Sequence, residues 1–338
     1  MSKPTKRSNV TLAEVAARAG VSRMTVSKAL RNTGSISADT RAKILGAVEE
    51  LGYVKNSLAG SLSSQRSEII GIVIPSASDS VFAEVLSGTN SVIRPKGLST
   101  LIGETLFDPQ VEYEILSTIM QMQPAGLIVS GGMNRLDKTR TLLERRRCPM
   151  ISIWDSESQV GDCTVGLSHR LAGQMMAEHF LAKGFSNIAY VGSELELDVC
   201  ARQRFEGFRD TLAAAGRSVR TEISATAPRQ TPSGRTLTET LLAKWPDTDA
   251  IQYLNDAMAI GGLSWLYDNS IDVPGQVAAA GFNGTATLQT IRTRLTTINA
   301  PRRFIGEAAA GALLNLIEDS GEPKSYNVEL DFIQGNTT

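Results

Sequence analysis

Residues 22–31 concentrate side chains that could bind a nucleic acid. Arg23 and Lys28 can donate hydrogen bonds to guanine O6 and N7, while Met24 offers an apolar surface to a base. Hydroxyl groups suited to phosphate oxygens are carried by Ser22, Thr25 and Ser27. Arg31 adds a positive charge at the end of the stretch. These residue types predict a helix whose exposed side reads DNA; the alternative is a helix of a protein-interaction module.

The charges of the 338-residue chain are unevenly distributed. Residues 1–66 hold 11 Lys and Arg against 4 Asp and Glu, a net charge of +7, whereas the remaining residues hold 23 against 31, a net charge of −8. A small basic segment on an acidic body indicates that the basic segment meets a polyanion. A solvated basic tail would carry the same charge, but it would lack a regular apolar pattern.

Capping residues predict three helices in the basic segment. Thr11 and Glu14 have the spacing of a capping box, and Gly20 suits the end of the first helix. Ser22 and Ser37 stand where they can cap a second and a third helix. The expected helices fall within residues 11–20, 23–32 and 37–52. Two short helices joined by a tight turn and supported by a third form a helix-turn-helix unit, whose second helix enters the major groove.

This segment closely resembles the head of the lac repressor/galactose repressor (LacI/GalR) family. The shared pattern consists of Ala16, Gly20, Val21, Ser22, Thr25, Val26, Ser27, Leu30, Leu51, Gly52, Tyr53 and Asn56. Lys28 and Lys55 depart from it, because most members have Arg at the first position and Pro at the second. Lys28 could alter base preference, since Lys is a point donor and Arg a bidentate fork. The predicted DNA-contacting residues are Thr11, Ser22, Arg23, Met24, Thr25, Ser27, Lys28, Arg31, Ser37, Asn56, Ala59 and Leu62.

The stretch NSLAGSLSS, residues 56–64, has the composition of a linker but the apolar spacing of a helix. In the family this segment is a hinge that becomes a short helix on DNA, and the resemblance implies that Leu62 is a wedge between central base pairs. Asn56 and Ala59 fall on backbone and groove contacts of the family. Gly60 costs roughly 1 kcal/mol relative to Ala in a helix, so partners must support the folding of this hinge.

From about Ser67 onward, short apolar runs rich in Ile, Val and Leu alternate with helical stretches. Apolar strands separated by helices indicate parallel sheets covered on both faces, and two such sets predict two doubly wound lobes. The expected fold is an all-α helix-turn-helix head joined to an α/β body, and the resemblance adds that the body shares the type I periplasmic-binding-protein fold. The predicted divisions are a DNA-binding head over 1–55, a hinge over 56–66, an effector-binding and dimerisation body over 67–338, a first lobe over about 67–166 and 299–320, and a second lobe over about 167–297 and 321–333.

Ligands of open α/β sheets lie beyond the carboxyl ends of the strands, so the cleft between the lobes is the expected effector site. The resemblance implies an effector-binding role for Arg204 and apolar or aromatic contacts from Phe82 and Leu167. Asn255 and Asp256 match an Asn-Asp pair of the family at a strand end, although Asp256 could instead cap a helix. Two further candidates, which follow another strand, are Trp154 and Asp155. The alternatives are core positions for the apolar candidates and a helix surface for Arg204.

Asn283 occupies a position at which sugar-responsive members usually carry Asp. Asn removes a negative charge while Arg204 remains, and Arg202 and Arg229 lie in neighbouring segments. This balance favours an anionic ligand, because a carboxylate facing a buried Asp would be penalised. The segments that look most like the gluconate-repressor subgroup are residues 74–88 and 165–179. We therefore expect a sugar acid (gluconate, a keto-gluconate or a phosphorylated relative) as the effector, with a neutral sugar as the alternative.

Residues that would support catalysis are few. His169 and His179 are the only histidines, and neither has metal-ligand or triad spacing. Patterns of the GxSxG, P-loop and GxGxxG types are missing, so neither an enzyme, a metal site nor a cofactor is expected. Cys148, Cys163 and Cys200 are scattered and are expected to be reduced packing residues. A solute-binding protein of transport shares the body's fold but would carry a secretory signal in place of the basic head.

The expected setting is the cytoplasm, because no apolar run could span a bilayer and the basic N-terminus lacks the apolar stretch of a signal peptide. One helix-turn-helix unit reads only a half-site, so a homodimer on near-palindromic double-stranded operator DNA is expected. The resulting hypothesis is a transcriptional repressor that a small sugar or sugar-acid effector releases from its operator. Corepression and activation are alternatives that the sequence leaves open.

Overall fold

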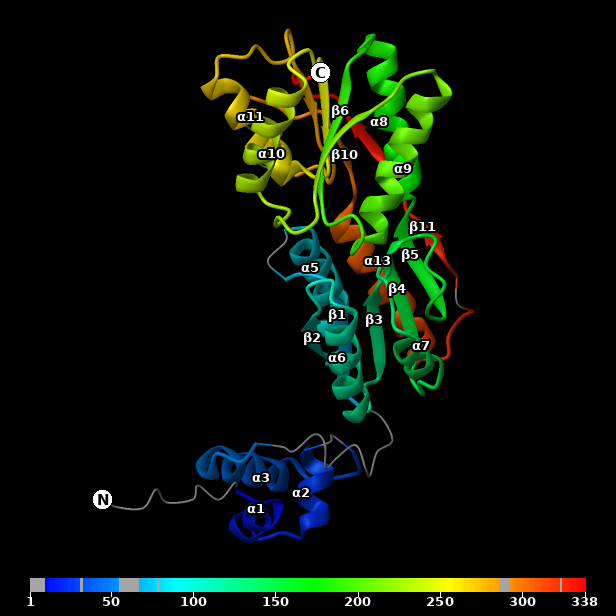
Figure 1. Cartoon of the computed structure of the whole chain (residues 1–338). Helices are drawn as coiled ribbons and strands as arrows, with labels where there is room; N and C mark the ends of the chain where they lie inside the picture. The colour runs from blue at the N-terminus through cyan, green and yellow to red at the C-terminus, as the bar shows by residue number, and fades with distance from the viewer. Residues whose placement is uncertain (1–9, 31–32, 55–66, 78–79, 286–291, 323) are drawn as a thin grey trace, which may run out of the picture. The chain divides into compact units, whose positions relative to one another are not determined.

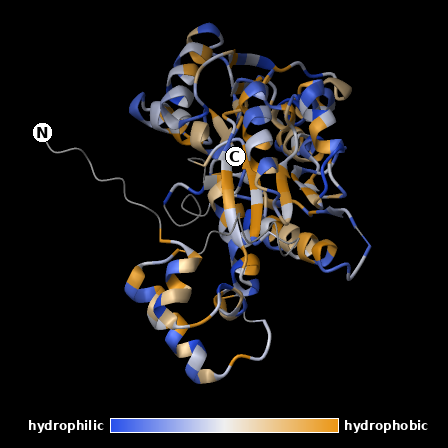
Figure 2. Cartoon of the chain, turned by 90° about the horizontal axis from the view of Figure 1, so that it is seen from below, coloured by the Kyte–Doolittle hydropathy of each residue, from blue (hydrophilic) through white to orange (hydrophobic). Residues whose placement is uncertain are grey.

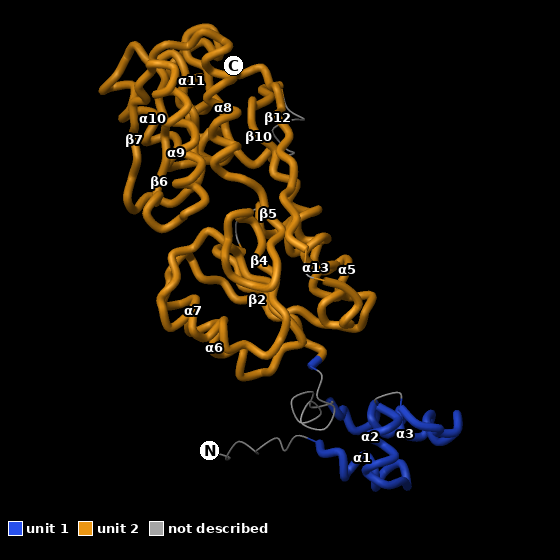
Figure 3. Tube along the Cα trace, turned by 90° about the vertical axis from the view of Figure 1, so that its right-hand side faces the viewer, with its two compact units in different colours: residues 1–67 blue, residues 68–338 orange. Residues whose placement is uncertain are grey.

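The computed structural model describes residues 10–30, 33–54, 67–77, 80–285, 292–322 and 324–338. The chain divides into two units, Met1–Ser67 and Glu68–Thr338 (Figure 3). Four of the predicted DNA contacts lie outside the described residues: Arg31, Asn56, Ala59 and Leu62.

The three helices of the head begin directly after the predicted capping residues Thr11, Ser22 and Ser37. They are α1 (Leu12–Ala19), α2 (Arg23–Leu30) and α3 (Ala38–Leu51) (Figure 1). The Glu14 amide donates to the Thr11 hydroxyl at 3.4 Å and the Thr11 amide donates to the Glu14 carboxylate at 2.7 Å, so the capping box is confirmed. Ser22 Oγ and Ser37 Oγ each accept from the amide three residues on, at 3.1 and 3.3 Å. Gly20 ends α1 at a φ of 67°, which favours glycine.

A small apolar core joins these helices. Val15, Val26 and Ile44 come from α1, α2 and α3 in turn, and all three are fully buried. Arg41 Nη1 on α3 donates to the carbonyl oxygen of Ala29 at 3.0 Å, which ties α3 to the last turn of α2. The predicted helix-turn-helix head is confirmed, and its second helix is held from one side only.

The first lobe of the body is built on a six-stranded parallel sheet with the order β11-β5-β4-β3-β1-β2. Its strands are β1 (Ile69–Ile74), β2 (Ser99–Glu104), β3 (Gly126–Ser130), β4 (Met150–Asp155), β5 (Cys163–Leu167) and β11 (Tyr326–Asn327). Its helices are α5 (Ser80–Ile93), the 3-10 turn η1 (Arg94–Lys96), α6 (Pro109–Gln121), α7 (Asp137–Glu144) and α13 (Arg302–Ile317). Ile70 and Ile72 of β1 pack in the core with α5 and α13, whereas Val73 packs with α6 and α7. Both faces of the sheet are thus covered.

The second lobe is built on a four-stranded parallel sheet with the order β7-β6-β8-β9. Its strands are β6 (Ile188–Ser193), β7 (Arg220–Ser224), β8 (Ala250–Tyr253) and β9 (Ala278–Ala280). Its helices are α8 (His169–Lys183), α9 (Val199–Ala214), α10 (Thr231–Lys244) and α11 (Asp256–Asp268). The pair α8 and α9 and the pair α10 and α11 lie on opposite sides of this sheet (Figure 1). In the body as a whole, apolar strands lie among helices of mixed hydropathy (Figure 2). The prediction of two doubly wound lobes is confirmed.

The helices of the body approach one another closely through glycines. A Cβ atom at any of these glycines would clash with a backbone carbonyl oxygen of the neighbouring helix. The reciprocal positions are Gly88 and Gly306 between α5 and α13, Gly173 and Gly207 between α8 and α9, and Gly234 and Gly261 between α10 and α11. Each helix pair therefore has its backbones in contact, which fixes the side chains that the pair carries toward the strand ends.

The third passage of the chain between the lobes differs from the prediction. Residues 321–333 were expected in the second lobe, but β11 pairs in parallel with β5 of the first sheet, Tyr326 opposite Val165. The chain reaches the second lobe only with β12 (Asp331–Ile333), which pairs antiparallel with β10 (Thr297–Asn299). The boundary at Ser320 was wrong because a two-residue strand has no apolar run to announce it. Within the described residues, no helix is both long and apolar enough to cross a bilayer.

Candidate functional site

The outward side of α2 is the candidate DNA-binding surface of the head. Met24 is 67% exposed, and Arg23 and Lys28 are also exposed. Val26 and Ala29 point into the core, so the base-reading candidates occupy the side of α2 that the other helices leave uncovered. This is the arrangement that a recognition helix requires.

The hydroxyl-bearing candidates of the head already have local partners. The hydroxyl groups of Ser22 and Thr25 lie 2.9 Å apart, and Ser37 Oγ donates to Thr40 Oγ1 at 2.8 Å. Ser27 is half-buried, and the Thr11 hydroxyl donates to Glu14 at 2.8 Å. Capping is the role that the structure gives Thr11, Ser22 and Ser37, and their contact with DNA remains a prediction.

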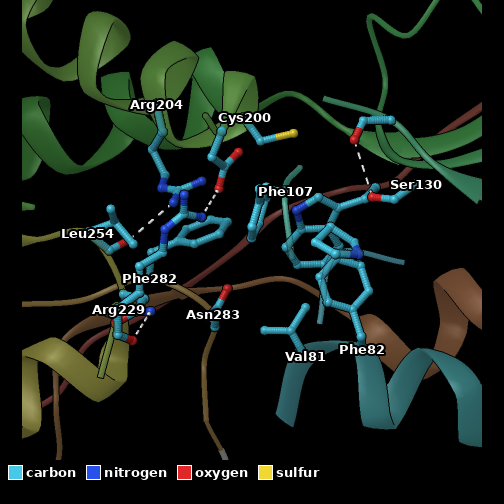
Figure 4. Close-up of a pocket in the computed structure, with 15 residues that line it drawn as sticks. Val81, Phe82, Phe107, Ser130, Cys200, Arg204, Arg229, Leu254, Phe282 and Asn283 are labelled. Atoms are coloured by element: carbon cyan, nitrogen blue, oxygen red, sulfur yellow. Dashed lines mark hydrogen bonds and ion pairs between the residues drawn. The ribbon is translucent and has the colours of Figure 1, made fainter. Parts of the chain in front are cut away.

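A cavity in the body lies where the carboxyl ends of its two sheets meet. Its volume, including the opening to solvent, is about 470 Å³. The lining residues are Pro75, Val81, Phe82, Phe107, Ser130, Gly131, Trp154, Asp198, Cys200, Arg204, Arg229, Leu254, Asn255, Phe282 and Asn283 (Figure 4). Most of them follow or end a strand, as expected of a ligand site in parallel α/β sheets.

Arg204 is a buried cation that forms no ion pair with any carboxylate in the part of the chain that the structure describes. Its Nη1 lies 2.9 Å from His169 Nδ1, its Nη2 donates to the Leu254 carbonyl oxygen at 3.1 Å, and its Cζ lies 3.8 Å from the centre of the Phe282 ring. Among the residues that the structure describes, no carboxylate lies within ion-pair distance of Arg204. Burial lowers the pKa of this guanidinium, although it stays protonated because the pKa of Arg begins far above neutrality. The residue is 7% exposed and borders the cavity, so it presents to the cavity a positive charge without an ion-pair partner among the described residues.

Arg229 also borders the cavity, but carboxylates neutralise it. Its Nη1 pairs with Asp198 Oδ2 at 2.5 Å and its Nε with Glu194 Oε2 at 3.1 Å. Its Cζ lies 4.2 Å from the centre of the Phe107 ring. Figure 4 shows the guanidinium groups of Arg204 and Arg229 on the same side of the cavity. The two arginines therefore differ in that carboxylates pair with Arg229, whereas Arg204 has no ion-pair partner among the described residues.

Aromatic rings form another part of the lining. Trp154 lies with its ring centre 5.8 Å from that of Phe82 and 6.5 Å from that of Phe282. Trp154 adopts a φ of 80°, which turns the backbone at the end of β4. Apolar ring faces of this kind suit the C–H faces of a sugar chain.

Asn255 and Asn283 both line the cavity, but they differ in whether hydrogen bonds to other described residues hold their side chains. Asn255 Oδ1 accepts from the Met258 amide at 2.9 Å and its Nδ2 donates to the Arg229 carbonyl oxygen at 3.2 Å. Asn255, and not Asp256, is thus the N-cap of α11. The Asn283 side chain points into the cavity (Figure 4) and has no hydrogen-bond partner among the described residues.

Three predicted effector residues do not line the cavity. Leu167 is fully buried in the core at the end of β5. Asp155 Oδ1 accepts from the Glu157 amide at 3.0 Å, and burial raises the pKa of this carboxyl. The Asp256 carboxylate accepts from Thr297 Oγ1 at 2.7 Å and from the Thr285 amide at 2.6 Å. In the structure Leu167 is therefore a core residue, and the carboxylates of Asp155 and Asp256 stabilise neighbouring backbone segments.

Comparison with known proteins assigns the family. The profile described as "Bacterial regulatory proteins, lacI family" matches residues 11–56, and that described as "Periplasmic binding protein-like domain" matches residues 177–338. The HTH-type transcriptional regulator GntR of Pseudomonas aeruginosa is 36% identical over 91% of this chain and 89% of its own length. The regulator of the same name from Escherichia coli K12 is 31% identical over 98% and 99%. The chain belongs to the lacI family of bacterial regulatory proteins.

A solved structure agrees with this assignment along the whole chain. A LacI-family transcriptional regulator from Silicibacter pomeroyi is 37% identical and superposes with a TM-score of 0.91 over 97% of this chain and 99% of that one. The predicted resemblance to the family and its gluconate-repressor subgroup is confirmed. This member of the lacI family is a DNA-binding transcriptional regulator.

Four important residues around the regulator's cavity were not among the predicted site residues: Phe107, Asp198, Phe282 and His169. Asp198 could have been suspected, because it lies six residues before Arg204 and caps α9 by accepting from the Ala201 amide. Phe282 adjoins Asn283 in sequence, and its ring covers Arg204. Phe107 and His169 gave no sequence signal that separates them from ordinary apolar or helix positions. In the part of the chain that the structure describes, no cluster of His, Cys, Asp and Glu could hold a metal ion.

Proposed function

We propose that this regulator is a repressor that leaves its operator when a sugar acid of the gluconate type binds in the body. The observation that carries the proposal is Arg204, a buried guanidinium that borders the cavity and has no carboxylate partner among the described residues. A buried charge without a partner is unfavourable, and an anionic ligand would supply that partner with short, charge-assisted hydrogen bonds.

The rest of the cavity suits the polyol chain of such a ligand. The Asn283 amide can both donate to and accept from hydroxyl groups, and it adds no negative charge to repel a carboxylate. The carboxylate of Asp198 can accept from a hydroxyl group while it neutralises Arg229. Phe82 and Trp154 offer apolar faces to C–H groups. The GntR names of the two curated relatives support the same subgroup.

The proposed DNA-bound form is a homodimer on a near-palindromic operator. One head presents a single exposed recognition helix, and paired half-sites require a second head related by two-fold symmetry. We assign residues 1–55 to the DNA-binding domain, 56–66 to the hinge and 67–338 to the effector-binding body. The residues proposed to contact the effector are Phe82, Trp154, Arg204, Asn255 and Asn283.

The test of the effector is calorimetric titration of the full-length protein with gluconate and with sorbitol. Sorbitol has the same carbon chain but a hydroxymethyl group in place of the carboxylate, so the pair isolates the charge. Gluconate is expected to bind at least about tenfold more tightly, the effect of one charge-assisted contact. Tighter binding of sorbitol or of a neutral sugar would refute the sugar-acid assignment. Footprinting of DNA that flanks the protein's own gene, with and without gluconate, tests release from the operator.

A further inference from the structure

His169 lies outside the cavity lining but contacts two residues that belong to it, one from each lobe. It is the first residue of α8, which Ser168 caps by accepting from the Leu171 amide at 3.2 Å. The imidazole is 1% exposed and does not line the cavity itself. Its Nδ1 lies 2.9 Å from Arg204 Nη1 on α9, and its Nε2 lies 3.2 Å from the carbonyl oxygen of Trp154 on β4. One ring thus joins a residue of the first sheet to a residue of the second lobe.

The two contacts define the protonation state of His169. A guanidinium can only donate, so Nδ1 accepts from Arg204 and carries no proton. The single proton is then on Nε2, which donates to the Trp154 carbonyl oxygen. Burial and the neighbouring Arg204 cation both hold the pKa of His169 well below its usual range, which agrees with a neutral ring.

A neutral acceptor orients a guanidinium without cancelling its charge. The contrast is Arg229, which the carboxylates of Glu194 and Asp198 hold in place and neutralise. Either kind of acceptor could fix an arginine in position, but only the neutral kind leaves a full positive charge for a ligand.

We propose that His169 is the positioning residue that makes this cavity select anions, because it holds Arg204 at the cavity wall and leaves its charge unpaired. The inference rests on the proposed sugar-acid effector and extends it to a residue that the ligand does not touch. The link to Trp154 adds that the same ring fixes the end of β4, where the indole joins the cavity wall.

The test is a matched pair of substitutions, His169→Asn and His169→Asp, in the full-length protein. The two new side chains have nearly the same size and shape, and both place an oxygen acceptor toward Arg204; they differ in charge. His169→Asn is expected to keep the preference for gluconate over sorbitol. His169→Asp pairs Arg204 and is expected to lower gluconate affinity at least about tenfold relative to His169→Asn, with sorbitol affinity changed by less than about threefold.

Calorimetry with both ligands on all three proteins separates the possible failures. Equal gluconate affinity of the two variants would overturn the role of His169, while a wild-type protein that does not prefer gluconate would overturn the sugar-acid effector. Thermal unfolding monitored by circular dichroism checks that the variants fold. If His169→Asp does not fold, the pair His169→Gln and His169→Glu makes the same comparison with a longer side chain.

Discussion

Arg302 and Glu84 form an ion pair between two helices that are far apart in sequence, with 3.1 Å between Nε and Oε2. Arg302 is the first residue of α13 and Glu84 lies on α5, two residues after Phe82 of the cavity. The same guanidinium donates to the carbonyl oxygens of Asn283 and Gly284. A single side chain therefore joins α5 and α13 to the loop that carries Asn283, which gives the cavity a direct connection to the first lobe.

Replacing Arg302 should destabilise the body. Arg302→Met leaves two buried carbonyl oxygens without this donor, and we expect the free energy of unfolding to fall by about 2 kcal/mol. The matched control is Arg303→Met at the next position, where the exposed pair with Glu307 predicts a change below about 0.5 kcal/mol. Urea unfolding measures both values. Equal effects of the two substitutions would contradict the linking role of Arg302.

The close contact between α5 and α13 should not tolerate a methyl group. At Gly306 a Cβ would clash with the Val85 carbonyl oxygen, so Gly306→Ala is expected to destabilise the body by about 1–3 kcal/mol. Gly311 lies on the same helix with nothing within 4 Å of its ideal Cβ, and Gly311→Ala is expected to stabilise by about 0.5–1 kcal/mol. Melting temperatures of the two variants should therefore move in opposite directions.

Removing the charge of Arg204 should separate effector binding from DNA binding. Arg204→Met keeps an unbranched apolar side chain but removes the cation, so gluconate affinity is expected to fall at least about tenfold. Arg202→Met, on the same helix, removes a half-exposed charge that lies 3.9 Å from the exposed Glu196 carboxylate, and should leave gluconate affinity unchanged. Both variants should bind operator as the wild type does in the absence of effector. Loss of operator binding by Arg204→Met alone would indicate misfolding.

The buried His169 should make stability depend on pH. The pKa of His169 is lowered from its ordinary value of 6.5 by burial and by Arg204. Above that value the ring is neutral in both the folded and unfolded states. As the pH falls below 6.5, the unfolded chain takes up a proton that the folded protein resists, so the wild type loses up to about 1.4 kcal/mol per pH unit from this group. Chemical unfolding at a series of pH values should show that the free energy of unfolding depends less steeply on pH in His169→Asn than in the wild type. Both proteins contain His179, so the difference between them reports on His169 alone.

Two lysines of the head should affect DNA binding differently. Lys28 lies on the exposed side of α2, and Lys28→Ala is expected to change base preference and cost about 1–3 kcal/mol at the preferred site. Lys43 on α3 pairs with Asp39 at 2.8 Å on the surface, and Lys43→Ala should weaken binding about equally at all sequences. Selection from a random DNA library, followed by binding at several salt concentrations, distinguishes the two effects. An unchanged sequence preference for Lys28→Ala would contradict its base-reading role.

Local features of the fold were predictable because they depend on residues close in sequence. The caps at Thr11, Ser22 and Ser37 need only a hydroxyl group and an amide three residues away. The strands of the body need only continuous apolar runs between helices. The lobe boundary near Ser320 failed because β11 is two exposed residues, and its pairing with β5 depends on tertiary structure.

The site was less predictable because its geometry depends on single-residue register. Trp154 lines the cavity, whereas Asp155 turns to a neighbouring amide. Asn255 rather than Asp256 caps α11, and this one-residue difference sends the Asp256 carboxylate to Thr297 instead of the cavity. No spacing in the sequence could place His169 against Arg204, because the two residues meet only when α8 packs on α9.

Arg229 is a second cation of the cavity lining, and its charge is neutralised by two carboxylates. Asp198 and Glu194 form ion pairs with the Arg229 guanidinium. The Arg229 side chain is only 12% exposed and still lines the cavity. An Asp198→Asn exchange, which preserves shape, would remove one of its two counter-charges and raise the formal charge of the lining by one. A cavity suited to a monoanion would then suit a dianion, such as a phosphorylated sugar acid. Position 198 is therefore a point in the lining at which exchange between Asp and Asn would change the match between the charge of the cavity and that of its ligand.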